Sequence, residues 1–574
     1  MVDRSVRWGR THRLLVATAL GAFAAPAVLG VAAQAASAAP APPVRGKVAV
    51  LKDQWGDASA DAVSKDATGL YQPQKDPGSL FTVTTATGAR AVWGHRDAAG
   101  RAVTGQGVTV ALLDSGVAPV AGLNGSGKVV QGPDLSLENN STTVAGLDTF
   151  GHGTHLAGIV AGADPTALDP KTGQPTGTKA GDELGIAPGA GILALKLATA
   201  TGSTDVSQVI AGLDWVSQHA HDNGMDVRVV NLSFGTDSLQ AYQVDPLAAA
   251  AENAWRHGIV VVVSGGNEGP GAGRLTDPAI DPYVIAVGAS DPVRAVSGWK
   301  APTVASFSSR GTTSRHVDLL APGRSITALR DPSSFIDVNH PEGLVAGDTT
   351  GRLFRGSGTS QAAAVVSGAA ALLVQADPAL TPDEVKAALT TTAAPVAGAS
   401  AVDQGAGELD LRAALAAVQP AEDGSIAVAG ATQTAPAATG VGSLEAARGG
   451  SHLTDPGNAA VLAGEVDVQG QPFVGASWDA ASVAGTSWSG GVWNSARWSG
   501  DGWTSARWSS ARWSDASWSS ARWSDASWDS ARWSDGSWSS ARWSSARWSD
   551  ASWTSARWSS AGWSSARWSD SNWD

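Results

Sequence analysis

The stretch 108–116 reads Val-Thr-Val-Ala-Leu-Leu-Asp-Ser-Gly, and it predicts the fold class. Its apolar run lacks polar alternation, which is typical of a strand buried on both faces. Helix-like stretches at 206–221 and 247–257 alternate with similar apolar runs, which lie at 227–232, 259–263 and 284–287. This alternation predicts an α/β fold with a doubly wound, mostly parallel sheet and helices on both faces.

The composition excludes several classes of protein. The chain has 574 residues and no cysteine, so a disulfide scaffold, a cysteine-ligated zinc site and a thiol nucleophile are excluded. Its 39 basic and 52 acidic residues give a net charge of −13. Because nucleic-acid partners require basic patches that neutralise phosphates, we expect no nucleic-acid partner.

The N-terminus has the three parts of a secretory signal peptide. Residues 1–13 carry four arginines, an apolar run follows at 14–33, and Ala-Ser-Ala at 36–38 is a small-residue cleavage pattern. We therefore assign 1–38 as signal peptide and expect cleavage before Ala39. A membrane anchor is the alternative, since the run is almost long enough to span a bilayer. We expect the mature chain to be secreted, with no membrane span.

Composition divides the rest of the chain into four parts. Residues 39–84 form a short mixed leader or linker, and 85–418 hold the alternating strand and helix pattern. An Ala/Gly/Pro-rich linker at 419–455 precedes a Trp-rich repeat at 456–574.

Two candidate residues suit acid–base chemistry. Asp114 ends the first strong strand, where sites form in open α/β sheets, although a turn or capping role is the simpler interpretation. His152 lies between two glycines, before a helix expected to run to about Ala161, and this position suits a general base. A metal pair with His155 is the alternative, but the glutamate and i, i+4 spacing of zinc peptidases are missing, so we interpret His155 as structural.

Two further candidates suit nucleophilic attack and oxyanion binding. Ser360 begins an apolar helix in 356–368, Gly-Ser-Gly-Thr-Ser-Gln-Ala-Ala-Ala-Val-Val-Ser-Gly, where the helix dipole and backbone N–H groups favour an anion. A simple N-cap serine is the alternative. Asn267 follows an apolar run and two glycines, so its amide could donate to a developing negative charge or serve an ordinary turn.

The order Asp114, His152, Asn267, Ser360 is more specific than any one of these signals. With the motifs around it, residues 85–418 resemble the subtilisin-like serine peptidases. The matching segments are 104–108 (Thr-Gly-Gln-Gly-Val), 184–189 (Leu-Gly-Ile-Ala-Pro-Gly), 231–235 (Asn-Leu-Ser-Phe-Gly), 321–323 (Ala-Pro-Gly) and 405–410 (Gly-Ala-Gly-Glu-Leu-Asp).

The resemblance implies a role for each candidate. Ser360 Oγ would attack the scissile carbonyl, and His152 would take its proton and return it to the leaving amine. Asp114 would fix the imidazole tautomer and stabilise the imidazolium. Asn267 and the N–H of Ser360 would bind the oxyanion.

The resemblance also implies how substrate binds. The segment Ser233, Phe234, Gly235 is similar to the family's substrate strand, where a peptide pairs as an added strand, so extended polypeptide is the expected substrate. No cofactor is expected for the chemistry. Relatives often bind structural calcium near the loop that is extended here at 163–182, but the sequence assigns no ligands.

The chain departs from the family pattern in two places. Gln361 and Ala364 stand where the family usually has methionine and proline after the nucleophile. The leader at 39–84 is shorter than the family's usual inhibitory propeptide and does not match it, so a propeptide role is left open.

The tail has a tryptophan at every fifth residue from Trp488 to Trp573. A repeat of five residues matches neither the helical period nor the strand period. Two alternatives follow for the tail, an ordered β-solenoid and a disordered stalk. Spaced indoles could bind cell-wall polysaccharide, hold the protein at a surface or drive self-association.

These patterns favour a secreted serine endopeptidase with an accessory tail. One alternative is a selective processing peptidase for an exported precursor. Another is a binding or surface protein whose catalytic residues are vestigial.

Overall fold

The computed structural model describes residues 53–498, apart from short internal stretches, and the backbone of 531–533 and 542–544. The stretches left out are 140–143, 170, 172–174, 177–180, 293, 296–297, 300–301, 422–424 and 455–459. The predicted signal peptide and most of the Trp-rich repeat lie outside the described residues.

An eight-stranded sheet organises the described chain, in the order β10-β7-β6-β5-β2-β4-β3 with β11 paired to β7. Every pair in it is parallel except β10 with β7. Its strands are β2 (Thr109–Asp114), β3 (Val129–Asp134), β4 (Gly191–Lys196), β5 (Val227–Leu232), β6 (Val260–Ser264), β7 (Ile285–Asp291), β10 (Thr303–Val304) and β11 (Leu319–Pro322). The predicted α/β class and mostly parallel sheet are confirmed.

Strand β2 lies where the order of the sheet reverses. Strands β4 and β3 lie on one side of it, and β5, β6 and β7 lie on the other. In such sheets, ligands bind beyond the carboxyl ends of the strands at the reversal point. Asp114 is the last residue of β2, so the fold places its carboxylate there.

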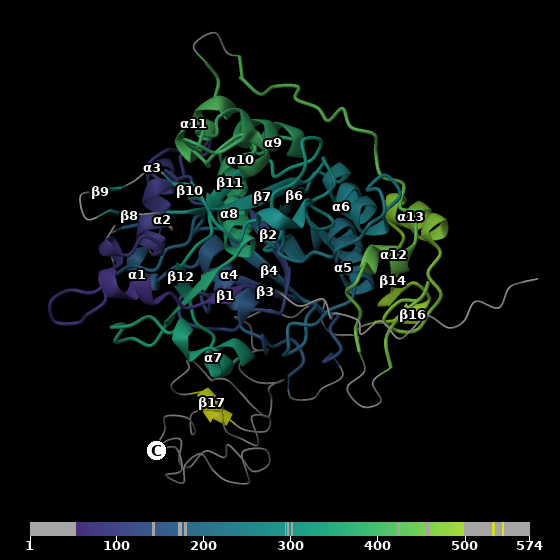
Figure 1. Ribbon diagram of the computed structural model, residues 1–574, viewed down its shortest axis with the longest axis horizontal. Helices are drawn as coiled ribbons and strands as arrows, with labels where there is room; N and C mark the ends of the chain where they lie inside the picture. The colour runs from purple at the N-terminus through teal and green to yellow at the C-terminus, as the bar shows by residue number, and fades with distance from the viewer. Residues whose placement is uncertain are drawn as a thin grey trace, which may run out of the picture. The chain divides into compact units, whose positions relative to one another are not determined.

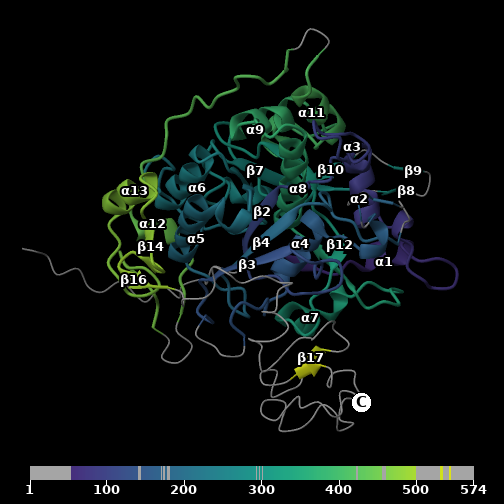
Figure 2. The ribbon, with the colours of Figure 1, turned by 180° about the vertical axis from the view of Figure 1, so that it is seen from behind.

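The main helices match the predicted ones within two residues at each end. Helices α5 (Val206–His219) and α6 (Pro246–Arg256) pack on each other, side by side in Figures 1 and 2. Helix α4 (His152–Ala161) ends where expected and packs on α8 (Thr359–Ala376), which lies against β5, β6 and β7. Within the described residues α8 alone has the length and hydropathy of a membrane span, and 94% of it is buried in the core.

Side-chain caps explain why several helices begin where they do. Asp205 and Gln208 form a reciprocal capping box at the start of α5. At α6 the Asp245 carboxylate accepts from two backbone N–H groups, and a proline occupies the first turn. The remaining helices are α1 (Ala58–Val63), α2 (Leu80–Ala86), α3 (Ala89–Val92), α7 (Phe335–Asn339), α9 (Pro382–Thr391), α10 (Ala401–Gln404), α11 (Leu411–Val418), α12 (Leu444–Arg448) and α13 (Gly475–Val483).

The leader forms a second small sheet with the body of the protein. Strand β1 (Gln54–Trp55) pairs antiparallel with β13 (Leu353–Ser357), and β13 pairs with β12 (Ile326–Leu329). Strands β8 (Arg294–Ala295) and β9 (Gly298–Trp299) form a separate two-stranded pair. The described part of the leader, drawn in purple in Figure 1, is therefore part of the folded structure.

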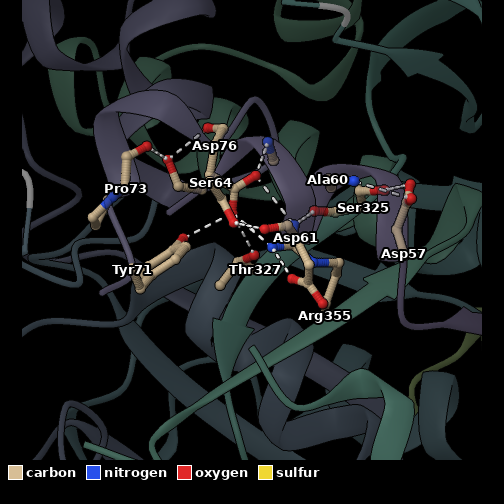
Figure 3. A network of polar contacts seen from close by, with 12 residues as sticks. Asp57, Ala60, Asp61, Ser64, Tyr71, Pro73, Asp76, Ser325, Thr327 and Arg355 are labelled. Carbon is tan, nitrogen blue, oxygen red and sulfur yellow. Dashed lines mark hydrogen bonds and ion pairs between the residues drawn. The ribbon is translucent and has the colours of Figure 1, made fainter. Parts of the chain in front are cut away.

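A buried arginine fastens the leader to β13. Arg355 is 1% exposed, and its two terminal nitrogens bind the Asp76 carboxylate at 3.1 and 3.0 Å. Asp76 also accepts from Tyr71 and Thr327, and Arg355 further donates to Asp61 (Figure 3). A bidentate arginine–carboxylate pair fixes geometry as well as adding energy. The network therefore holds the leader independently of β1.

The first part of the Trp-rich tail packs against α5. Strands β14 (Trp488–Ser489), β15 (Val492–Trp493) and β16 (Ala496–Arg497) form an antiparallel meander. Its two-residue turns have positive φ at both positions, as primed hairpin turns require. Later units lie outside the described residues, except that β17 (Ala531–Trp533) and β18 (Arg542–Ser544) pair antiparallel.

A single carboxylate on α5 holds this aromatic cluster. Asp214 accepts from Trp478 Nε1 at 2.8 Å, from Trp493 Nε1 at 2.7 Å and from Ser482 Oγ at 2.5 Å. The rings of Trp493 and Trp498 meet edge to face, with centroids 5.0 Å apart. Burial raises the pKa of Asp214, and the three donors oppose that rise.

Replacing Asp214 should detach this part of the tail. In a Ser360→Ala background, which removes the predicted nucleophile, Asp214→Ala leaves two buried indole N–H groups without their acceptor. We expect the free energy of unfolding in urea to fall by at least about 2 kcal/mol, and trypsin to cut faster after Arg497. The half-exposed Asp226 provides the control, as Asp226→Ala. Unchanged unfolding and digestion in Asp214→Ala would contradict this anchoring role.

Candidate active site

The four predicted residues meet at the carboxyl edge of the sheet. Asp114 ends β2, Asn267 follows β6, His152 is the first residue of α4 and Ser360 is the second residue of α8. Gly151, just before α4, has a φ of 101°, a left-handed conformation that glycine adopts without strain. The chain thus turns sharply and begins the helix at the histidine.

Asp114 and His152 form a buried pair. Nδ1 of the imidazole lies 2.8 Å from Oδ1 and 2.9 Å from Oδ2 of the aspartate. The backbone N–H of Ser115 donates to the same Oδ1 at 2.8 Å. The carboxylate therefore fixes both the orientation of the ring and the proton on Nδ1.

Asp148 positions the start of α4, and sequence reasoning missed it. One of its oxygens accepts from Gly151 N and Ser115 Oγ, and the other accepts from Thr154 N and Oγ1. It thereby ties the turn after β2 to the first turn of the helix that carries His152. The signal available was a polar residue four positions before the histidine in Asp-Thr-Phe-Gly-His.

Asn267 is oriented by the residue before the nucleophile. Its Oδ1 accepts from Thr359 N at 2.8 Å and from Thr359 Oγ1 at 3.0 Å. Its Nδ2 therefore points away from these groups and donates 3.0 Å to a carboxylate oxygen beside Ser360. An amide held in this way is a preorganised donor for negative charge.

That carboxylate belongs to Asp53, at the start of the described leader. Its Oδ1 accepts from Ser360 Oγ at 3.1 Å and from Asn267 Nδ2 at 3.0 Å. Its Oδ2 lies 2.9 Å from both His152 Nε2 and Gln361 Nε2. Asp53 was not among the predicted site residues, because nothing in the leader sequence signals contact with residues 99 to 308 positions away.

The position of Asp53 makes His152 an imidazolium. Both ring nitrogens face carboxylate oxygens, which only accept, so both nitrogens carry protons. Burial lowers the pKa of His152, but Asp114 and then Asp53 outweigh it and raise the pKa to about 10. In this conformation the imidazole cannot take a proton from Ser360, and a substrate can enter only when Asp53 leaves.

Gln361 has a role here that its departure from the family pattern did not suggest. Its amide is one of the four donors to Asp53, and it is fully buried at the start of α8. Ala364 is also fully buried, and α8 runs unbroken from Thr359 to Ala376.

The predicted substrate strand borders a pocket beside the nucleophile. Ser233, Phe234 and Gly235 line it, with Thr276 on the adjoining wall and Ser360 at its edge. These three residues directly follow β5, so they lie at the same sheet edge as Asn267. The position suits an extended chain that passes over Ser360.

Two acidic side chains, Asp164 and Glu183, flank the described part of the 163–182 loop. Asp164 Oδ1 is paired with Arg352 Nη2 at 2.6 Å, so a guanidinium already neutralises this carboxylate. Burial and then Asp164 raise the pKa of the neighbouring Glu183 to about 8, which favours its neutral form. Among the residues that the structure describes, no group of three or more Asp, Glu, His or Cys side chains could hold a metal ion.

His155 belongs to the packing around the site. Its ring is buried and meets Trp55 edge to face at 5.7 Å. Burial, and then the charge on His152, lower the pKa of His155 to about 3, so it is neutral.

The contribution of the Asp53 contact to stability should depend on pH. The pKa of His152 is raised from 6.5 to about 10, so its charged form stabilises the fold fully below about pH 6.5. This stabilisation is lost as the pH rises through about 10. In a Ser360→Ala background, the unfolding free energy with Asp53 should exceed that of Asp53→Asn, and this excess should shrink between pH 6.5 and pH 10, mainly toward the alkaline end, because Asp114 still raises the pKa of His152 in the variant. An excess that stays constant over this range would contradict the charge assignment.

Comparisons with known proteins identify the family of this chain. The model of the Subtilase family, Peptidase_S8, matches residues 105–437. Serine protease AprX of Bacillus subtilis is 37% identical over 323 residues, which are 55% of this chain and 67% of that protein. Subtilisin Savinase of Lederbergia lenta is 33% identical over 297 residues, 51% of this chain and 86% of that protein.

A solved structure, fervidolysin from Fervidobacterium pennivorans, aligns with a TM-score of 0.46 and 25% identity over 64% of this chain and 50% of that one. The family match spans more than half of the chain, and AprX is matched over two thirds of its length. The chain belongs to the subtilase family, and it is a subtilisin-like serine endopeptidase that acts on polypeptides.

Proposed function

We propose that the enzyme is secreted and cleaves extended polypeptide through Asp114, His152 and Ser360, with Asn267 in the oxyanion hole. The observation that carries the proposal is the convergence of Ser360 Oγ, His152 Nε2 and Asn267 Nδ2 on one carboxylate. A nucleophile, a base and an oxyanion donor that share one small volume form the arrangement needed for acyl transfer.

The reaction follows from these positions once Asp53 has left and His152 Nε2 has released to water the proton that it shares with that carboxylate. The scissile carbonyl carbon takes the place of the carboxyl carbon, and Ser360 Oγ attacks it while His152 Nε2 takes the hydroxyl proton. Asn267 Nδ2 donates to the oxyanion, and Asp114 holds the imidazolium that forms. His152 then gives the proton to the leaving amine, and water repeats the sequence to release the acid. This chemistry needs no cofactor.

The substrate proposal rests on the strand Ser233, Phe234, Gly235. Its backbone borders the pocket next to Ser360, where an added strand would find hydrogen-bonding partners. Folded proteins rarely present such a strand, so unfolded chains are the expected substrates. Export rests on the signal-peptide pattern at 1–38.

Two variants test the catalytic roles. Ser360→Ala should abolish cleavage of unfolded casein and labelling by a fluorophosphonate. Asn267→Ala should retain labelling but lose about 10² to 10³ in kcat, the magnitude known for one oxyanion-hole donor in subtilisin. Product ends mapped by mass spectrometry then separate a general endopeptidase from a selective one. Casein cleavage that persists in Ser360→Ala would overturn the assignment.

For the tail we propose attachment, either to cell-wall polysaccharide or between copies of the chain. The proposal rests on the pentapeptide repeat beyond Trp498, since the tail indoles from Trp478 to Trp498 are buried on α5 or on one another. Amphipathic indoles with free faces bind sugars and other rings.

The structure sets the boundary for a test of the tail. A chain ending at residue 498 keeps the Asp214 contacts, whereas one ending at 455 loses them. We expect the chain ending at 498 to retain casein cleavage and to lose binding to insoluble cell-wall polysaccharide or to sediment as a smaller species. Retention and sedimentation equal to those of the full chain would show that the repeat is not the anchor.

A further inference from the structure

The segment Asp53–Trp55 crosses the site in the manner of a bound peptide. Gln54 lies opposite Ser357 and Trp55 lies opposite Gly356 on β13, and β13 leads directly into the turn before Ser360. The side chains alternate as in a strand: Asp53 is directed at the catalytic groups, Gln54 is exposed, and Trp55 is partly buried against the protein.

The position of each residue relative to a scissile bond follows from the covalent structure. The Asp53 carboxyl carbon lies where the donors from Ser360, Asn267 and His152 converge, and two bonds through Cβ join it to Cα. In a substrate, two bonds through the amide nitrogen join the scissile carbonyl carbon to the next Cα. Asp53 therefore occupies the position of the first substrate residue after the scissile bond. Gln54 occupies the position of the second residue and Trp55 that of the third.

Trp55 occupies an aromatic site. Its ring lies 5.7 Å from Phe354, and it meets His155 and His152 edge to face at 5.7 and 6.3 Å. It packs against the small cluster of Phe150, Ile336 and Phe354, which is separate from the main core. Edge-to-face and tilted contacts at these distances favour an aromatic ring beyond the area it buries.

Gly356 leaves space for the indole of Trp55, because it has no side chain. A Cβ atom there would lie 2.6 Å from Cζ3 of Trp55, closer than real Cβ contacts. Its other close neighbour is the Gln361 amide nitrogen at 2.9 Å. A side chain at 356 would therefore fill the space of the indole while leaving β13 its main-chain bonds.

We propose that the enzyme has an aromatic subsite for the third residue after the scissile bond, formed by Phe354, His155 and Gly356, which Trp55 occupies in this structure. The inference rests on the proposed function and adds a preference for Trp, Tyr or Phe at that substrate position. Because the Arg355–Asp76 network holds the leader separately, Trp55→Ala empties the subsite without releasing the leader.

The test uses the full-length chain as Trp55→Ala, Trp55→Ala with Gly356→Ala, and Trp55→Ala with Gly271→Ala. Gly271 is the matched control, because a Cβ there meets nothing within 4 Å. The ends of the casein products first identify one sequence that the enzyme cleaves. Two quenched fluorescent peptides of that sequence then differ only in Trp or Ala at the third position after the bond.

We expect the Trp55→Ala enzyme to cleave the Trp peptide with a kcat/KM about tenfold or more above that for the Ala peptide. Most of this difference should come from a lower KM for the Trp peptide. The Gly271 control should keep this ratio, and the Gly356 variant should bring it close to one while fluorophosphonate still labels Ser360. Should Gly356→Ala fail to fold, aromatic enrichment at the third position among casein products of Trp55→Ala replaces it.

Two results would overturn the inference in distinguishable ways. Equal kcat/KM for the two peptides in Trp55→Ala, or no aromatic enrichment in its products, removes the subsite and leaves the peptidase assignment intact. Absence of both casein cleavage and Ser360 labelling in every chain, and also in Asp53→Ala, which lacks the carboxylate that covers the site, removes the proposed function, and the subsite falls with it.

Discussion

The parallel pairing of β2 with β4 and β5 is the constraint on which the active site depends. Because these strands run in one direction, their carboxyl ends meet at one edge, and residues from distant parts of the sequence emerge together there. Asp114 ends β2, Asn267 follows β6, which runs parallel to β5, and the helices that return along the sheet begin with His152 and Thr359–Ser360. Helix starts also supply N–H groups and positive potential where negative charge develops.

The sequence predicted those features that depend on local pattern. Continuous apolar runs marked the parallel strands, polar residues at the ends of such runs marked Asp114 and Asn267, and flanking glycines before a helix marked His152. Helices α4, α5 and α6 came out within one or two residues, because apolar periodicity and capping side chains are both local signals. The geometry brings the predicted catalytic residues together, and the family comparison supports the same chemistry.

The contacts that sequence reasoning missed are long-range and polar. Arg355 pairs with Asp76 at a separation of 279 residues, Arg448 with Asp205 at 243, and Trp493 with Asp214 at 279. A single buried charge or indole gives no periodicity, and its partner cannot be recognised before the fold is known. These pairs hold the leader and the beginning of the tail on the body, so both segments are structural parts of the enzyme. Asp53 was missed for the same reason.

The leader strand β1 is an intramolecular ligand of the active site. Once the Arg355 network has fixed the neighbouring leader, Asp53 and Trp55 meet the cleft at an effective concentration that for short tethers reaches about the millimolar range. A free peptide at micromolar concentration competes poorly with such a ligand, even if each of its contacts is as good. Cutting the chain between Trp55 and the anchored residues from Asp57 onward would change this balance without altering any contact. The segment ending at Trp55 would then bind the cleft as a separate peptide, and its occupancy of the cleft would depend on its concentration in solution.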